Sequence, residues 1–303
     1  MHMWAQWLKQ PQTLWIRRAL FQIHLWTGLA IGLYIVMLSL TGTLLVYRVE
    51  LERSFQTPRP AFEPNRQRLS TEQLTAAAQQ AYPDWNVTRV GSRITRRNPV
   101  IEVWVERNGE KKERLFNPYT GADLGDAIPA RVRALDWVAE LHDDLLLEET
   151  GSVLNAIGSG IFTLLVLSGI VVWWPGVRNW RRALVIKRGT NWLRFNWDLH
   201  SAIGFWSLWL LLIWGLSGVY LAHPDPFANF VDRISDPDAV LGQRPGDIVL
   251  SWLSRLHFGR FRNAPYLQVL WVPLGLAPTV MFVTGVVMWW NRVLRRRKVE
   301  RAA

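Results

Sequence analysis

Four long stretches of the chain contain no Asp, Glu, Lys or Arg. They are Ala19–Tyr47, Gly151–Val177, Leu199–His223 and Asn263–Asn291. A helix that spans a bilayer needs about 20 predominantly apolar residues, so each stretch is long enough to cross a membrane. The sequence therefore predicts a mainly α-helical membrane protein with four transmembrane helices. No short apolar core with an Ala-x-Ala cleavage site precedes the first stretch, so we expect it to be retained as an anchor.

The basic residues are distributed unevenly among the segments that flank these stretches. The segment before the first stretch, the loop 178–198 and the tail 292–303 together hold 15 of the 35 basic residues but only 2 of the 24 acidic residues. The loops 48–150 and 224–262 hold the remaining charges and are slightly acidic. Because positively charged loops remain in the cytoplasm, we expect both termini there and these two loops on the outer side. The positive-inside rule accounts for the net charge of +11, so the expected partner is the lipid bilayer and not a nucleic acid.

The first outer loop, 48–150, is long enough to fold by itself. Its sequence predicts a helix that is capped by Ser70 or Thr71 and stops before Pro83. Alternating apolar residues follow at 100–105, and the letters RNGE after them are typical of a hairpin turn. We therefore expect a small α+β module with its core at about 69–126. The second outer loop, 224–262, is shorter, with one brief helical stretch at 246–261.

The two halves of the chain repeat one another, which predicts a four-helix bundle built from two duplicated helix pairs. In each half, a histidine is followed by glycines at +4 and +18, and a second histidine precedes another glycine by 27 or 28 residues. The repeated positions are His24, Gly28, Gly42, His142 and Gly169 in the first half and His200, Gly204, Gly218, His257 and Gly285 in the second. All four stretches carry Ser-Gly or Thr-Gly near their C-terminal ends, and the second and fourth end in Trp-Trp followed by arginines.

The duplicated histidines are expected to meet in pairs. In the predicted topology, His24 and His200 begin helices at the cytoplasmic face, whereas His142 and His257 precede helices that start at the outer face. Two neutral imidazoles opposed across a helical bundle are the ligand set for a bis-His haem. We therefore interpret the four histidines as the axial iron ligands of two b-type haems.

The repeated glycines are candidates for leaving room beside a porphyrin. Gly28 and Gly204 follow the cytoplasmic-side histidines by one turn. Gly42 and Gly218 follow them by five turns, about 27 Å along the axis, so we expect them near the outer-side haem. Gly169 and Gly285 are expected near the cytoplasmic-side haem.

Structural alternatives stay open for these residues. Glycine in a membrane helix often marks close helix packing. Histidine at a helix end is often a capping residue, and Trp-Trp at a span end is typical of an interfacial belt. His223 aligns with Tyr47 in the repeat and is an alternative outer ligand.

The residue types that are missing exclude several kinds of chemistry. With no cysteine, the chain cannot bind an iron–sulfur cluster, a thiolate-ligated haem or a covalent c-type haem through its own residues. It also has no Walker loop, no HExxH and no G-x-G-x-x-G in a strand–helix context. If the protein transfers electrons, a separate donor must therefore supply them. The sequence indicates no catalytic acid or base.

Several motifs, in this order, resemble the PepSY-associated transmembrane family, bacterial iron-regulated inner-membrane proteins that include siderophore reductases. These motifs are the His24-x-Trp26-x-Gly28 start of the first stretch, NPYTGADLG, LHDDLLL, WDLHSAIGFW, LHFGRF and the Trp-Trp endings. The resemblance implies a di-haem reductase of the bacterial inner membrane, with a PepSY-like periplasmic module. It further implies an inner haem held by His24 and His200, an outer haem held by His142 and His257, and a ferric siderophore as substrate.

Two other classes of function remain open from the sequence. One keeps the haems but passes electrons to a quinone or another acceptor. The other is non-enzymatic, either a siderophore permease or a membrane protein that binds a partner through its PepSY-like module.

Overall fold

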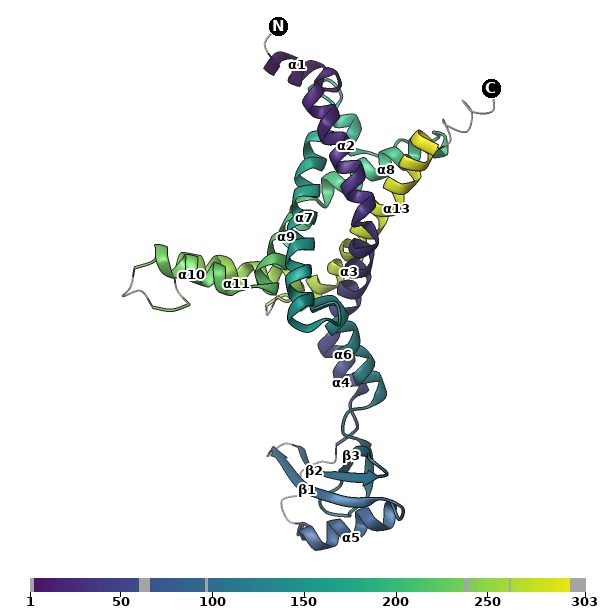
Figure 1. Ribbon diagram of the computed structural model, residues 1–303, viewed down its shortest axis with the longest axis vertical. Coiled ribbons are helices and arrows are strands. Elements are labelled where there is room, and N and C mark those ends of the chain that lie inside the picture. Colours follow the sequence, from purple (N-terminus) through teal and green to yellow (C-terminus); the bar gives the residue numbers. More distant parts are fainter. Residues whose placement is uncertain are drawn as a thin grey trace. The chain divides into compact units, whose positions relative to one another are not determined.

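The computed structural model describes residues 3–59, 66–95, 98–236, 240–242, 244–261 and 263–294. These residues belong to two compact units, one made of Tyr47–Trp137 and the other of Met1–Val46 with Val138–Ala303. The first unit contains the predicted α+β module, and the second contains the long apolar helices (Figure 1).

The small unit is an antiparallel sheet with a helix packed on it. Its elements are α4 (Arg48–Phe55), α5 (Thr71–Ala81), β1 (Asn86–Thr95), β2 (Asn98–Arg107), β3 (Glu110–Phe116) and β4 (Asp123–Asp126), and α6 (Ala130–Asp143) follows and continues into the helical unit. The strands lie in the order β1-β2-β3-β4. The sequence prediction of a helix followed by an antiparallel meander is confirmed.

Local sequence explains both the start of α5 and the hairpin. The Ser70 hydroxyl accepts a hydrogen bond from the Gln73 backbone N–H, and the Gln73 side chain accepts one from the Ser70 N–H, which completes a capping box. Between β2 and β3, Asn108 and Gly109 have φ angles of 51° and 83°. Two adjacent residues with positive φ form the type of turn that matches the twist of a hairpin.

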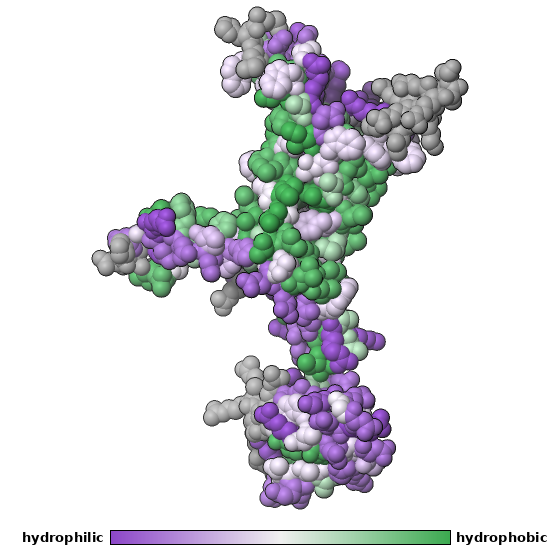
Figure 2. Space-filling view, viewed as in Figure 1, coloured by the Kyte–Doolittle hydropathy of each residue, from purple (hydrophilic) through white to green (hydrophobic). Residues whose placement is uncertain are grey.

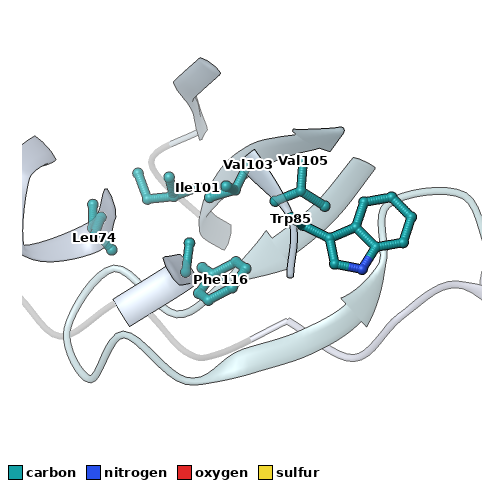
Figure 3. Packing of buried hydrophobic residues seen from close by; sticks show 7 residues of the cluster. Leu74, Trp85, Ile101, Val103, Val105 and Phe116 are labelled. Atoms are coloured by element: carbon teal, nitrogen blue, oxygen red, sulfur yellow. The ribbon is translucent and has the colours of Figure 1, made fainter. Parts of the chain in front are cut away.

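The core of the small unit lies between α5 and one face of the sheet (Figure 3). Its buried side chains are Leu74, Ala78, Trp85, Ile101, Val103, Val105 and Phe116. Val103 and Val105 are fully buried, as expected for alternate residues of a strand that has one face covered. At the edge of this core, Arg114 bridges Asp123 and Asp126, and the Tyr82 hydroxyl donates a hydrogen bond to Asp123.

The helical unit contains most of the chain. Its helices are α1 (Met3–Lys9), α2 (Trp15–Ala30), α3 (Gly32–Leu45), α7 (Glu148–Trp173), α8 (Trp192–Trp206), α9 (Leu208–Ala222), α10 (Asp225–Ile234), α11 (Pro245–Phe258), α12 (Gln268–Gly275) and α13 (Ala277–Trp289). Short 3-10 turns η1 (Pro11–Thr13), η2 (Trp180–Leu184) and η3 (Pro265–Leu267) and a π-helical turn, η4 (Trp290–Leu294), complete it. The space-filling view shows a broad apolar surface over the long helices (Figure 2).

Two segments, Glu148–Trp173 and Pro265–Arg292, are long and apolar enough to cross a membrane as single helices. The first and third predicted spans are not straight: α2 and α3 meet at 61°, and α8 and α9 meet at 62°. The breaks fall at Ile31 and Ser207, each seven residues after the histidine of its half. Counting each bent pair as one span gives the four that the sequence predicts.

The long helices pack in the order expected of a bundle: α2 on α7, α7 on α9, α8 on α13, and α13 on α3. Small residues permit the close approaches. A Cβ on Gly215 of α9 would lie 2.3 Å from the Thr163 hydroxyl of α7, and one on Gly32 of α3 would overlap the Phe282 ring of α13. Small residues at such contacts are typical of helix pairs in membranes.

Candidate functional site

The four duplicated histidines lie in the helical unit on four different helices. His24 is on α2 and His200 on α8, which we call the first histidine pair. His142 is near the end of α6 and His257 in the last turn of α11, which we call the second histidine pair. His24 and His200 thus lie on the first helices of the two bent pairs, and His142 and His257 lie near the C-terminal ends of their helices.

The second pair is in direct ring contact. The centroids of the His142 and His257 imidazoles are 6.3 Å apart, and the ring planes make an angle of 66°. An imidazole nitrogen binds a transition metal at about 2.0–2.1 Å, so one metal ion held between two opposed rings separates their centroids by roughly 6 Å. His24 and His200, on α2 and α8, make no such ring contact within the described residues.

Each of the four imidazoles is hydrogen-bonded through Nδ1 to a hydroxyl on a neighbouring helix. The partners are Ser168 for His24 (3.0 Å), Thr284 for His200 (2.8 Å), Thr41 for His142 (2.8 Å) and Ser217 for His257 (2.7 Å). All four are the Ser or Thr of a Ser-Gly or Thr-Gly dipeptide. The same contact thus recurs at every histidine, and it always joins two elements of one half.

These hydroxyls act as acceptors, because each donates its only proton to its own helix. Thr41 donates to Met37 O at 2.8 Å, Thr284 to Val280 O at 2.7 Å, Ser217 to Ile213 O at 2.6 Å and Ser168 to Leu165 O at 2.7 Å. Bonding of this kind to the preceding helical turn is common for Ser and Thr. The imidazole Nδ1 must therefore carry the proton in each contact. For His24 the Leu165 carbonyl, 3.1 Å from Nδ1, leads to the same assignment, because a carbonyl only accepts.

A proton on Nδ1 leaves the lone pair on Nε2, the arrangement found in metal-binding histidines. Within the ranges that the structure describes, no hydrogen bond joins Nε2 of these four residues to another group. Burial lowers the pKa of His142 to about 4 and that of His257 to about 3, with the neighbouring imidazole contributing to the shift at His257. The second pair is therefore neutral, and a neutral imidazole is the form that binds a metal.

Three of the six candidate glycines lie against a histidine. A Cβ added to Gly42 would lie 2.8 Å from His142 Cε1, one on Gly169 would lie 3.2 Å from His24 Cε1, and one on Gly285 would lie 3.6 Å from His200 Cε1. In each of these dipeptides, the hydroxyl residue bonds the imidazole and the following glycine leaves space for the ring.

The other three candidate glycines face other side chains. Gly28 faces Leu165, and Gly204 faces Met281 at the matching position of the second half. Gly218 is nearest to Ser159 of α7, at 2.6 Å from an added Cβ, rather than to His257. At Gly218 the structure therefore favours the alternative interpretation, in which the glycine permits close packing of two helices.

The end of α11 holds His257 in place. Gly259, with φ of 64°, ends the helix in the left-handed conformation that favours glycine. The Trp271 ring packs against Gly259, and its indole N–H donates to Leu256 O at 2.8 Å. A second indole, that of Trp214, donates to the His257 carbonyl at 3.2 Å. Free carbonyls in the last helical turn are thereby satisfied.

The end of α6 holds His142 by a different set of contacts. The Asn155 side chain on α7 donates to the His142 carbonyl at 2.8 Å and accepts from the Tyr34 hydroxyl at 2.6 Å. The chain then turns sharply into α7 through Leu145 and Leu146, whose φ angles are 57° and 61°. A positive φ at such bulky residues is uncommon and marks a conformation imposed by its surroundings.

The remaining sequence candidates lie outside these contacts. His223 is the C-cap residue of α9, and the imidazole that contacts the His257 ring is that of His142. The tryptophans of the two Trp-Trp dipeptides differ in their surroundings. The Trp173 ring stacks on Phe205 with centroids 4.7 Å apart, whereas Trp290 is 53% exposed, as an interfacial residue would be.

Sequence reasoning missed the four hydroxyl residues as members of the site. The available signal was the recurrence of Ser or Thr before Gly42, Gly169, Gly218 and Gly285. A hydroxyl in a helix usually bonds its own backbone, so the pattern alone does not indicate a second partner.

Fold and site together define a helical membrane protein with a small α+β module and four histidines, each hydrogen-bonded through Nδ1 to a hydroxyl of a neighbouring helix. The sequence matches the profile of the PepSY-associated TM region over residues 21–247 and 234–292. The chain belongs to this family. It is also 31% identical over 129 residues to the uncharacterized protein PA4219 of Pseudomonas aeruginosa. That match covers 37% of this chain and 31% of the relative, so the chain matches less than a third of the relative's length.

Proposed function

We propose that the protein is a di-haem reductase of the bacterial inner membrane that reduces ferric siderophores. In this proposal His24 and His200 hold one b-type haem, and His142 and His257 hold the other. Electrons enter from a separate donor on the cytoplasmic side and leave to Fe(III)-siderophore on the periplasmic side, where iron is released as Fe(II).

The observation that carries the proposal is the bonding of the four histidines. Each Nδ1 donates to a hydroxyl whose own proton is already engaged, so four Nε2 lone pairs are available at repeated positions. The 6.3 Å between the His142 and His257 rings fits one iron held from both sides. Four imidazoles and no thiolate are the donor set of bis-His haem.

Haem, when bound, supplies a one-electron couple. The contribution of the chain is to hold each iron through two imidazoles, to fix ring orientation through the hydroxyls, and to keep water away by burial. Hydrogen-bond partners of ligating histidines, such as these hydroxyls, raise the basicity of the ligand and tune the reduction potential of the metal. Reduction of a bound ferric ion at the edge of the outer site needs no acid or base from the protein.

The topology of the proposal rests on charge and on the duplicated helix pairs. The three flanking segments with nearly half of the basic residues would all lie in the cytoplasm. The first histidine pair would then lie toward the cytoplasm and the second toward the periplasm. The matching hydrogen bonds and helix breaks in the two halves support a duplicated helix pair as their origin.

The deciding experiment is a visible spectrum of the purified protein, as isolated and after dithionite. Two low-spin b-type haems predict a strong Soret band and sharp α bands on reduction, with haem and protein in a ratio near two to one. Addition of ferric siderophore to the reduced protein should reoxidise these bands, and a quinone analogue tests the alternative acceptor. A protein that is colourless yet fully functional would rule the proposal out and leave the permease and partner-binding functions.

A further inference from the structure

The helices α10 and α11 form a hairpin that its own contacts hold together. Arg244 donates to Asp232 of α10 at 2.7 Å and to both oxygens of Asp247 in α11 at 2.8 and 2.9 Å. Val231 is buried against Gly246, where a Cβ would lie 2.6 Å from the valine methyl groups. The hairpin therefore has a defined structure of its own, although much of its apolar surface is left uncovered.

The apolar side chains of α10 lie on one side of the helix. Phe227, Phe230, Val231 and Ile234 are spaced i, i+3, i+4 and i+7, which places them along one stripe. Phe227 packs on Tyr220 of α9, and Val231 packs on α11. Phe230 and Ile234 stay 60% and 64% exposed. The stripe is thus only partly covered by the protein.

In α11 the exposed apolar residues also lie together. Ile248, Val249 and Trp252 fall within one side of the helix and are about half exposed. Ser251 lies outside this arc, and His257 points from a third side into the bundle. A helix with one side on protein, one apolar side free and one polar side matches a position at a membrane surface.

The depth of α11 relative to the membrane spans is fixed by His257. Its Nδ1 bonds Ser217, which lies five residues, about 7.5 Å, before the end of α9. The last turn of α11 therefore lies beside the final turns of a candidate span. At the other end of the hairpin, α10 begins at Asp225, three residues after α9 stops. Both helices run across the direction of α7 and α9 (Figure 1).

We propose that the α10–α11 hairpin is an interfacial element that lies in the surface of the bilayer, with its exposed apolar side chains among the lipid acyl chains. The occupant of this face is phospholipid, because α10 follows directly after α9 and His257 of α11 bonds Ser217 near the end of α9, so the exposed apolar side chains are held at the level where that span ends. Arg255 stacks on Trp252 with 5.5 Å between guanidinium carbon and ring centroid, a position from which its charge reaches lipid phosphates. This placement does not depend on what the four histidines bind.

The absence of cysteine permits a direct test by site-directed spin labelling of the full-length protein. Single substitutions Ile234→Cys and Val249→Cys report on the apolar face, and Asn229→Cys and Ser251→Cys are the matched polar positions on the same helices. Leu164→Cys, at a 66% exposed position of α7, serves as the reference inside the bilayer. The labelled proteins are placed in nanodiscs of phosphatidylcholine with some phosphatidylglycerol, and oxygen and nickel-chelate accessibilities are measured.

Labels at 234 and 249 should be reached by oxygen and protected from the nickel chelate, like the label at 164. The labels at 229 and 251 should show the reverse, with a several-fold difference in the ratio of the two accessibilities. A nickel-chelate accessibility at 249 as high as that at 251 would overturn the proposal, because it would place both sides of α11 in water. Protection from both reagents, with spin–spin broadening, would also overturn it and assign the face to a second copy of the chain.

Discussion

Thr41 accepts a hydrogen bond from His142, with 2.8 Å between the threonine Oγ1 and the imidazole Nδ1. The threonine hydroxyl in turn donates to Met37 O one turn earlier in α3. Three further Ser or Thr residues make the same two hydrogen bonds at the other histidines, and we call this arrangement the hydroxyl relay. The hydroxyl thereby determines which nitrogen of the neighbouring imidazole carries a free lone pair. Burying the hydroxyl costs little free energy, because both of its hydrogen bonds are made.

Thr41→Val tests this relay, because valine keeps the shape of threonine and removes the acceptor. The His142 Nδ1–H loses its hydroxyl partner, and loss of such an outer partner weakens metal binding by about 10–100-fold. We expect haem titrations to show weaker binding at the second pair by about this factor, with the first pair unchanged. Thr41→Ser, which restores the hydroxyl, is the control and should bind as the native protein does. Equal affinity in the valine and serine variants would show that the hydroxyl does not orient the ligand.

The sequence predicted the helical class and the small α+β module because each has a local signature. Uncharged stretches mark candidate spans, and a capping box marks α5. The bends at Ile31 and Ser207 were not predicted, because apolar composition continues through them and the break arises where α3 and α9 turn toward other helices. The helix α10 was missed for a similar reason: it is short and follows Pro224 directly after a span.

Side-chain partners across helices were the least predictable part of the site. Gly42 and Gly218 are equivalent in the repeat, yet one faces His142 and the other Ser159. The difference depends on how closely α9 packs on α7, which no single stretch of sequence specifies.

His257→Ala should remove one of two haems, because His142 alone cannot hold the iron from both sides. The spectrum of the purified variant should lose about half of its Soret absorbance, and electron transfer to ferric siderophore should be abolished. His223→Ala is the matched control at the same end of the bundle, and its haem content should equal that of the native protein. Haem loss in His223→Ala with retention in His257→Ala would exchange the roles of these two residues.

Gly42→Ala and Gly28→Ala separate space for an imidazole from general helix effects. An added Cβ at Gly42 would lie 2.8 Å from His142 Cε1, which forces the ring to move, whereas at Gly28 the nearest atom is 3.7 Å away. We expect Gly42→Ala to lower haem occupancy and shift the α band of one haem, and Gly28→Ala to resemble the native protein. Gly160→Ala, with open space around the added atom, controls for the higher helix propensity of alanine. Identical spectra for all three variants would contradict the placement of His142 against α3.

Tyr82 gives the small unit a dependence on alkaline pH. Burial, together with the hydrogen bond to Asp123, raises the pKa of Tyr82 from about 10 to about 12. The folded state therefore favours the neutral phenol. This contribution to stability is complete below the unfolded pKa and is lost as pH rises from about 10 through about 12. Tyr82→Phe removes the titrating group, so the small unit of this variant should lose less stability over that interval than the native unit does.

Urea-dependent cleavage by subtilisin within β1 to β3 of the full-length protein measures this difference, because cleavage reports the population of the unfolded module. Tyr266→Phe, a 73% exposed position in the helical unit, is the control and should follow the native pH profile. The variant is expected to be less stable than the native protein at neutral pH, because it lacks the bond to Asp123, and the two stabilities should converge as the pH approaches 12. Parallel curves up to that pH would show that the phenol does not titrate differently on folding, and that Arg114 and its two aspartates hold this edge of the sheet without it.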